Sequence, residues 1–372
     1  MVSQQQINRY QPDYITTPGE ILEEYLDSIA MTKAELARRT GLTSKTINEI
    51  IKGRAPVTPE TALKLERVFG RPARFWINLE ALYQEDRVRL AEQESMEANL
   101  DWQAKFPVRE MIKLGWLPDD KDKTKRFESL LRFFGVASPM QWEAIWISPN
   151  VAYRQSNKFK ISREAVSAWL RRGELEAREI SCQPFNPTLF QDTLSDIRKL
   201  TQERDPQVFV PSLTRKCAAA GVAVIFTPSL PQTRISGAAR WVNGKPVIQL
   251  SLRHGSNDHI WFTFFHESVH ITKHGKKLLF LDWEEALDGD CEEEANSFAS
   301  NLLIPSAKLM QFVCLQNFSR AAVIEFARSI EIAPGIVVGR LQHDRHIPFN
   351  RLNDLKVTYS WEKSDCASSP SG

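Results

Sequence analysis

Residues 260–270 read Ile260-Trp-Phe-Thr-Phe-Phe-His-Glu-Ser-Val-His270, an apolar run of helical length that ends in the pattern His-Glu-x-x-His. Two histidines four residues apart project from one face of an α-helix, so both rings can reach a single metal ion. Glu267 points slightly to one side, where it can accept a proton from a water molecule beside the metal. The stretch therefore predicts a buried helix with His266 and His270 as metal ligands and Glu267 as the catalytic base.

A second helix is predicted between residues 291 and 305, because apolar residues recur there at three- and four-residue steps and Pro305 ends the pattern. Glu292 and Asn296 lie four apart on one face of this helix. The Glu292 carboxylate would complete a His-His-Glu set with a fourth position open to water, as in hydrolytic zinc centres. Asn296 is then placed to orient one of the histidines.

Other interpretations of this segment remain open. Glu294 is the main alternative ligand to Glu292, and Cys291 is a weaker one. Three successive glutamates also suit a solvated helix start, where acidic side chains interact favourably with the helix dipole.

A buried-type strand is expected at 221–227, and the Asn243-Gly244 pair predicts a hairpin between 238–242 and 246–250. We expect an extended peptide to pair with this hairpin above the metal helix.

The C-terminal part of the chain contains four motifs that occur together: Ser236-Gly-Ala-Ala-Arg-Trp241, Phe262-Thr-Phe-Phe-His-Glu-Ser-Val-His270, Glu292-x-x-Ala-Asn-x-Phe-Ala-x-x-Leu-Leu-Ile-Pro305 and Gly335-Ile-Val-Val-Gly-Arg-Leu-Gln-His343. With these motifs, the chain from about Gly221 to Leu355 resembles the ImmA/IrrE family of metallopeptidases. The resemblance implies an α+β zincin-like domain whose zinc ligands are His266, His270 and Glu292 and whose general base is Glu267. It also implies an endopeptidase that acts on regulators with helix-turn-helix domains.

The N-terminal part of the chain has a different pattern. Leu36 and Ala37, a turn at Gly41, and then Ile47 and Ile50 predict two short helices in helix-turn-helix arrangement. Residues 33–80 hold ten Lys and Arg against five Glu, whereas the whole chain has a net charge of +2. Concentrated positive charge is typical of a DNA-binding module. A small helical bundle with a solvated basic face is the alternative. The predicted DNA-contacting residues are Thr43, Ser44, Lys45, Thr46, Asn48 and Lys52.

The same region contains the motifs Pro18-Gly-Glu-Ile-Leu22, Leu36-Ala-Arg-Arg-Thr-Gly41, Val57-Thr-Pro-Glu-Thr-Ala-Leu-Lys-Leu65 and Phe75-Trp-Ile-Asn-Leu-Glu-Ala-Leu-Tyr83. With these motifs it resembles the HigA-type antitoxin branch of the XRE-like regulators. The resemblance implies binding to double-stranded operator DNA as a homodimer, and many such proteins pair with a toxin.

Length and composition fit a multidomain protein of the cytoplasm. A chain of 372 residues is too long for one ordinary core, and 42% hydrophobic residues are enough to build several. Five cysteines without a Cys-x-x-Cys pair suit a reducing compartment, and neither a long apolar span nor a signal-peptide pattern is visible. We expect an all-α DNA-binding domain at 14–83, a helical connector at 84–205, the α+β metallopeptidase domain at 206–360 and a disordered tail at 361–372.

The predicted connector carries no recognisable chemistry. Within it, Ser162 and Gly173 are expected to begin and end an amphipathic helix, with Arg171 and Arg172 on a solvated face. The region would set the distance between the DNA-binding and peptidase domains, although a regulatory ligand site there is also open.

Two functions follow from these patterns. In the first, a DNA-bound stress-response regulator carries an active zinc endopeptidase that cleaves a repressor or antitoxin-like partner. In the second, an antitoxin-like repressor uses its metal domain as a non-catalytic sensor or protein-binding module. His343, His346 and Arg240 are candidate donors to the oxyanion, while His254, His259 and His274 are expected to be structural or surface residues.

Overall fold

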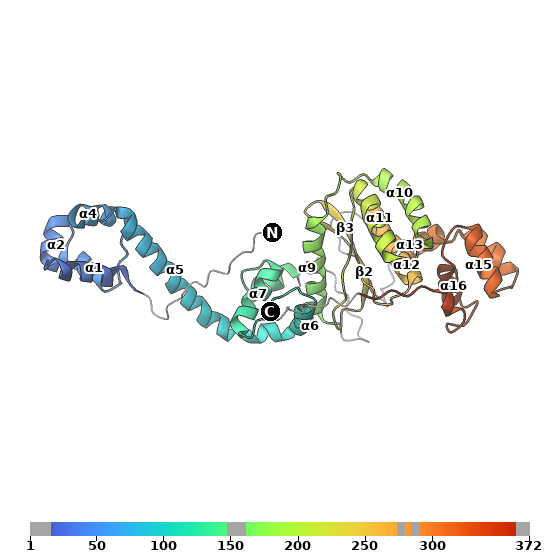
Figure 1. The fold of residues 1–372 in the computed structure, drawn as a ribbon, viewed down its shortest axis with the longest axis horizontal. Coiled ribbons are helices and arrows are strands. Elements are labelled where there is room, and N and C mark those ends of the chain that lie inside the picture. Colours follow the sequence, from blue (N-terminus) through green and yellow to red (C-terminus); the bar gives the residue numbers. More distant parts are fainter. Residues whose placement is uncertain (1–15, 147–160, 274–279, 284–289, 362–372) are drawn as a thin grey trace, which may run out of the picture. The chain divides into compact units, whose positions relative to one another are not determined.

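The computed structural model describes residues 16–146, 161–273, 280–283 and 290–361 (Figure 1). Contacts within the chain divide it into two units, Met1–Leu100 and Asp101–Gly372. The described part is mostly helical, and its one sheet lies in the second unit. The four-segment division expected from the sequence stays a prediction, and most of its tail, together with His274, lies outside the described residues.

The first unit consists of helices, as expected. Each of its first four helices begins at a threonine whose side chain accepts a hydrogen bond from the backbone N–H three residues later, which satisfies an otherwise unpaired donor. Leu22, Leu36, Ile47, Leu65 and Trp76 are completely buried and form its core. The helices are α1 (Pro18–Ser28), α2 (Lys33–Thr40), α3 (Ser44–Ile51), α4 (Pro59–Phe69) and α5 (Ala73–Ala98).

The predicted helix-turn-helix is present as α2 and α3. Gly41 follows α2 with φ of 67°, a left-handed conformation that glycine adopts without steric cost. Thr43 then begins α3 by accepting a hydrogen bond from the Thr46 N–H at 3.0 Å. Only two residues therefore separate the capping glycine from the first residue of α3.

The second unit surrounds a small sheet with helices. Before the sheet come η1 (Leu100–Lys105), α6 (Val108–Lys113), α7 (Lys123–Phe134), α8 (Pro139–Trp146), α9 (Arg163–Glu179), α10 (Pro187–Lys199), η2 (Leu200–Gln202) and α11 (Pro206–Ala219). The strands are β1 (Ala223–Phe226), β2 (Ile235–Val242), β3 (Lys245–Leu250) and β4 (Phe280–Trp283). Helix α12 (Asn257–Lys273) lies between β3 and β4, and α13 (Asp290–Leu303), α14 (Ser306–Cys314), α15 (Arg320–Ser329), α16 (Pro334–His343) and η3 (Asn353–Leu355) follow.

The sheet has the order β1-β3-β2-β4, with β1 parallel to β3 and the other pairs antiparallel. The predicted hairpin is confirmed as β2 and β3, and Asn243 and Gly244 both have the positive φ that its turn requires. The expected pairing of a peptide with the hairpin stays a prediction: β3 lies between β1 and β2, while β4 pairs with β2 from Ile235 to Ala239, before Arg240–Val242. Among the described strands, the sheet ends at β1 and β4.

Alternate residues of the strands face two different layers. Val247 and Ile225 pack with Ala177 of α9 on one face, whereas Ile248 and Leu250 contact the apolar side chains of α12 on the other. Helix α12 is enclosed further by α13 and α16. A helix covered on several sides must be apolar nearly all round, which explains the run of large hydrophobic residues before His266.

Helix α9 differs from its prediction in two ways. It begins after Ser162 as expected, but it continues past Gly173 to Glu179. Gly173 lies against Gln249 of β3, where a Cβ atom would come within 2.0 Å of the amide oxygen. Arg171 is buried rather than solvated, since it donates to the Phe133 carbonyl and pairs with Glu174, each at 2.7 Å. Part of the predicted connector therefore packs against one face of the sheet.

Candidate metal centre and nucleic-acid interface

Helices α12 and α13 bring His266, His270 and Glu292 together. The Nε2 atoms of the two histidines lie 3.1 Å apart. The Glu292 carboxylate approaches them to 3.0 Å from His266 Nε2 and 3.5 Å from His270 Nε2. Among the described residues this is a group that can hold a metal ion, with all its ligand-type atoms within 4.8 Å of one another.

The spacing of these atoms fits zinc. Bonds of about 2.0–2.1 Å in tetrahedral geometry separate neighbouring ligand atoms by about 3.3 Å. The three observed separations, 3.0, 3.1 and 3.5 Å, lie on both sides of that value. Two imidazole nitrogens and a carboxylate oxygen are also the donor set that a hydrolytic zinc site uses.

Asn296 holds one ring in the form that a metal requires. Its Oδ1 lies 3.0 Å from His266 Nδ1, so a hydrogen on Nδ1 is donated to the amide oxygen. The other ring nitrogen, Nε2, faces the other ligands, and it can offer its lone pair to a metal that replaces the hydrogen bond between Nε2 and Glu292.

The charge of Glu292 is fixed by its neighbours. Burial alone would raise the pKa of this carboxyl, but the hydrogen bonds with His266 and His270 outweigh it and lower the pKa to about 2. The carboxylate is therefore ionised at neutral pH, as a ligand must be. Glu294, the alternative ligand, instead pairs with Lys273 at 2.5 Å, and Cys291 is exposed.

Glu267 is completely buried and lies under strand β2. The contact depends on Gly237, since a Cβ atom there would lie 2.8 Å from Glu267 Oε1 and 2.4 Å from Thr263 Cγ2. Sequence reasoning quoted Gly237 within a motif but gave it no role. Its only signal was a glycine inside a strand, which can mark a close approach of two segments.

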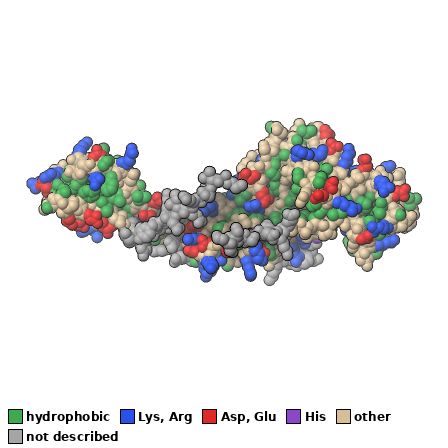
Figure 2. All heavy atoms as spheres, viewed as in Figure 1, with side chains coloured by type: hydrophobic (Ala, Val, Ile, Leu, Met, Phe, Trp, Pro, Cys, Tyr) green, Lys and Arg blue, Asp and Glu red, His purple; other side chains and the backbone are tan. Residues whose placement is uncertain are grey.

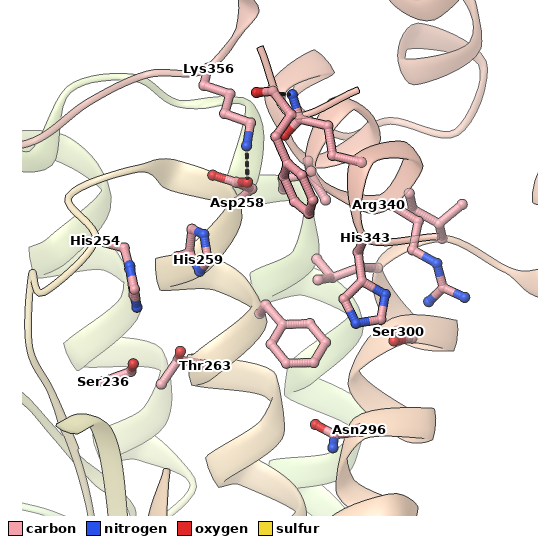
Figure 3. A pocket seen from close by; sticks show the side chains of 17 residues that line it. Ser236, His254, Asp258, His259, Thr263, Asn296, Ser300, Arg340, His343 and Lys356 are labelled. Atoms are coloured by element: carbon pink, nitrogen blue, oxygen red, sulfur yellow. Dashed lines mark hydrogen bonds and ion pairs between the residues drawn. The ribbon is translucent and has the colours of Figure 1, made fainter. Parts of the chain in front are cut away.

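The candidate oxyanion donors lie in different surroundings. Arg240 donates to the Leu170 carbonyl of α9, and the His346 ring stacks on Phe318. His343 lines a cavity beside the metal centre (Figure 3). His254 and His259, which were expected to be structural or surface residues, line the same cavity and stack with ring centroids 4.3 Å apart.

The predicted DNA-contacting residues gather on α3. Thr43, Ser44, Lys45 and Asn48 are exposed near the N-terminal end of the helix, and Lys52 is exposed at its other end. Thr46 is half-buried, and its hydroxyl lies 2.8 Å from that of Thr43.

Part of the positive charge of this unit is balanced internally. Arg38 and Arg39 both pair with Glu35, and Lys64 pairs with Glu60. Among the described residues, the structure shows no such ion pair for Lys45 or Lys52. Several Lys and Arg side chains are visible on the surface of this unit, at the left of Figure 2.

Comparison with known families finds one match in each of the two units. Residues 22–76 match the helix-turn-helix family, and residues 217–317 match the IrrE N-terminal-like domain. The chain joins an XRE-type helix-turn-helix domain to an IrrE-like domain. The helix-turn-helix and IrrE-like domains inferred from the sequence are thereby confirmed. No helix in the described part of the chain is long and apolar enough to cross a membrane.

Curated relatives are helix-turn-helix regulators and virulence-associated proteins. Virulence-associated protein I of Dichelobacter nodosus is 37% identical over 84 residues, which are 22% of this chain and 75% of that protein. The uncharacterized HTH-type transcriptional regulator YddM of Escherichia coli K12 is 36% identical over 63 residues, 17% of this chain and 67% of that protein. Among solved structures, the Pseudomonas aeruginosa antitoxin HigA with its higBA promoter is 30% identical, covers 23% of this chain and 94% of its own, and has a TM-score of 0.22.

The close contact at Gly237 generates a stability prediction. We expect Gly237→Ala to lower the free energy of unfolding by about 1–3 kcal/mol, because the added methyl group overpacks the space between β2 and α12. Chemical denaturation of the two proteins measures the difference. The double variant Gly237→Ala/Thr263→Ser should recover part of the loss, since it removes the nearer methyl group. Unchanged stability of Gly237→Ala would contradict the tight packing.

Proposed function

We propose that this protein is an antitoxin-like DNA-binding regulator whose C-terminal domain is a zincin-like, zinc-dependent endopeptidase. Its substrate would be a repressor or antitoxin-like protein partner. The observation that carries the proposal is that His266, His270 and Glu292 converge at the spacing of zinc ligands. The Glu267 carboxylate directly follows His266 on α12. The IrrE-like match over residues 217–317 supports the same reading.

The proposed roles follow from the chemistry of each side chain. His266, His270 and Glu292 would hold the zinc, and Asn296 would keep the His266 ring in place. When bound, zinc polarises the scissile carbonyl and lowers the pKa of a water molecule. Glu267 accepts the proton of the attacking water and passes it to the leaving amine as the C–N bond breaks. The enclosed position of Glu267 under β2 holds its carboxylate in one place for both transfers.

The burial of the metal centre favours a second candidate function. His266, Glu267 and His270 are only 2%, 0% and 1% exposed, so a peptide has little direct access to them in this conformation. A metal site that is closed to substrates suits a structural or sensory role. In that case the protein is an antitoxin-like repressor whose DNA affinity responds to zinc.

The DNA-binding part of the proposal rests on α3. Its exposed polar residues Ser44, Lys45 and Asn48 lie where a recognition helix presents side chains to base edges and phosphates. We infer a homodimer, because helix-turn-helix proteins usually read two half-sites related by two-fold symmetry.

Metal analysis tests the ligand assignment. Purified wild-type protein should carry about one zinc per chain, and His266→Ala and Glu292→Ala should lose most of it, since each removes one of three protein ligands. Glu294→Ala is the matched control and should keep its zinc, because Glu294 pairs with Lys273. Equal zinc in all four proteins would remove these residues from the metal site.

Turnover tests the catalytic base. Using a mixed peptide library as substrate, we expect zinc-loaded Glu267→Gln to retain its metal but to cleave about 10²–10⁴ times more slowly than wild type. Glu293→Gln, which changes an exposed neighbouring carboxylate, should cleave normally.

Two results would count against this mechanism. Undiminished cleavage by Glu267→Gln would exclude Glu267 as the base. If the zinc-loaded wild type cuts no peptide or regulator while a chelator alters its DNA affinity, the sensory function is correct instead.

A salt titration tests the DNA interface. Each phosphate contact contributes about 0.9 to the slope of log affinity against log salt. We therefore expect Lys45→Ala to weaken binding to random-sequence duplex DNA and to reduce that slope by about 1. Lys199→Ala removes an equally charged, exposed lysine from the other unit and should leave the slope unchanged. An unaltered slope in Lys45→Ala would place Lys45 outside the interface.

A further inference from the structure

A cavity of about 430 Å³ lies beside the metal centre (Figure 3). Its walls come from β2, from the loop before α12, from α12, α13 and α16, and from the chain segment that contains Lys356. The volume is within the range of about 300–1,000 Å³ that ligand pockets occupy. Most of the lining residues are polar or charged, and three of them are histidines. The cavity therefore suits a ligand that forms hydrogen bonds or carries a charge.

One face of α13 connects the cavity with the metal centre. Glu292, Asn296 and Ser300 follow one another at four-residue intervals, so they lie on the same side of this helix. Asn296 contacts His266, and both Asn296 and Ser300 line the cavity. From α12, Phe262 lines the cavity one helical turn before His266, with the ring centroids 6.2 Å apart. A ligand in this cavity therefore lies next to a peptide that is bound at the metal.

The walls offer little to a positively charged ligand. Among the described residues that line the cavity, Asp258 is the only carboxylate. Its Oδ2 atom pairs with Lys356 Nζ at 2.7 Å, and its Oδ1 atom is buried away from the cavity space. A cation would therefore find no unpaired carboxylate here, and enclosing a charge without a partner is costly.

Basic side chains face the cavity from two sides. His254 and His259 lie on one side, and Arg340 and His343 lie on the other (Figure 3). The ion pair of Arg340 with Asp344, at 2.6 Å, uses Nε and leaves the terminal guanidinium nitrogens without a partner among the described residues. His343 Nδ1 lies 3.1 Å from Asp344 Oδ1, so a doubly protonated ring still has Nε2 as a donor for a ligand.

The two histidines on the first side lie close enough to influence each other. Their rings stack with centroids 4.3 Å apart. Two imidazolium rings at this separation repel each other, so protonation of both is unfavourable unless an anion is near. A bound anion reduces this repulsion and is attracted by the protonated rings in turn. The arrangement of charges therefore favours a negatively charged ligand.

We propose that this cavity binds the carboxylate of an acidic side chain of the substrate, an aspartate or glutamate next to the cleaved bond. The inference rests on the proposed endopeptidase function, since it names the kind of residue beside that bond. Aspartate and glutamate are the side chains that an unmodified peptide uses to present an anionic hydrogen-bond acceptor. His259 of α12 and His343 of α16 are then specificity-determining residues.

Two small probes of nearly equal shape that differ in charge test the pocket. Acetyl-glutamate α-amide and acetyl-glutaminamide are titrated into the full-length, zinc-loaded protein, and binding is followed by NMR. We expect the glutamate compound to bind about tenfold more tightly, because hydrogen bonds between ionised groups are stronger than those of a neutral amide.

Removal of single imidazoles locates the bound carboxylate. His259→Gln and His343→Gln should each lower the preference for the glutamate compound to about threefold, since each removes one cationic donor. Arg345→Gln is the matched control. It removes an exposed positive charge two positions after His343 that does not line the cavity, and it should keep the tenfold preference.

A charge added to the lining gives an independent measurement. Ser300→Asp places a carboxylate in the cavity from α13 and leaves all three histidines in place. It should abolish the preference for the glutamate compound, because the new carboxylate repels the bound one. An unchanged zinc content shows that the metal centre of this variant is intact.

The possible results separate this inference from the proposed function. Equal binding of the two compounds to the wild type, or a preference that survives in His259→Gln, His343→Gln and Ser300→Asp, overturns the pocket. These measurements need no turnover, so the preference and its loss in the variants support the pocket even in a protein that cleaves nothing.

The source of the carboxylate is tested with the mixed peptide library. An acidic residue enriched at one position beside the cut assigns the carboxylate to the substrate. Cleavage without such enrichment would leave the endopeptidase standing and overturn the substrate assignment, and the cavity would then bind a small free carboxylate instead.

Discussion

The structure depends on placing polar metal-binding groups inside an apolar layer. Helix α12 is enclosed by the sheet, α13 and α16, yet it carries two imidazoles and a carboxylate on its inner turns. Such groups are tolerated in a core only when each meets a partner. Glu292 and Asn296 reach across from α13, and the absence of a side chain at Gly237 lets β2 close over Glu267. The packing of α12 against α13 is therefore inseparable from the chemistry of the centre.

Local patterns in the sequence were sufficient to predict the position of groups that lie on one helix or in one turn. The spacing of His266 and His270, the capping by Thr43 and the hairpin at Asn243 are all set by residues a few positions apart. The apolar periodicity of α13 also indicated which face would hold Glu292. These features follow from helix and turn geometry alone.

What the sequence did not predict are contacts between segments that lie far apart along the chain. Gly173 has the local signature of a helix end, but its missing side chain makes room for Gln249 instead. Arg171 lies in a charge-rich stretch, yet its guanidinium reaches a carbonyl of α7. The sequence also does not reveal that β4 returns to pair with Ile235–Ala239 of β2, next to the strand where a peptide was expected.

The start of α12 is also tied to the end of the described chain. Asn257 donates its backbone N–H to the Val357 carbonyl, and its side chain accepts from the Val357 N–H, across a separation of 100 residues. At a synthesis rate of about 5–20 residues per second, that closing segment leaves the ribosome about 5–20 s after Asn257. The nascent chain must therefore carry an incompletely anchored metal-ligand helix throughout this interval, and maturation of the centre is a late step in biogenesis.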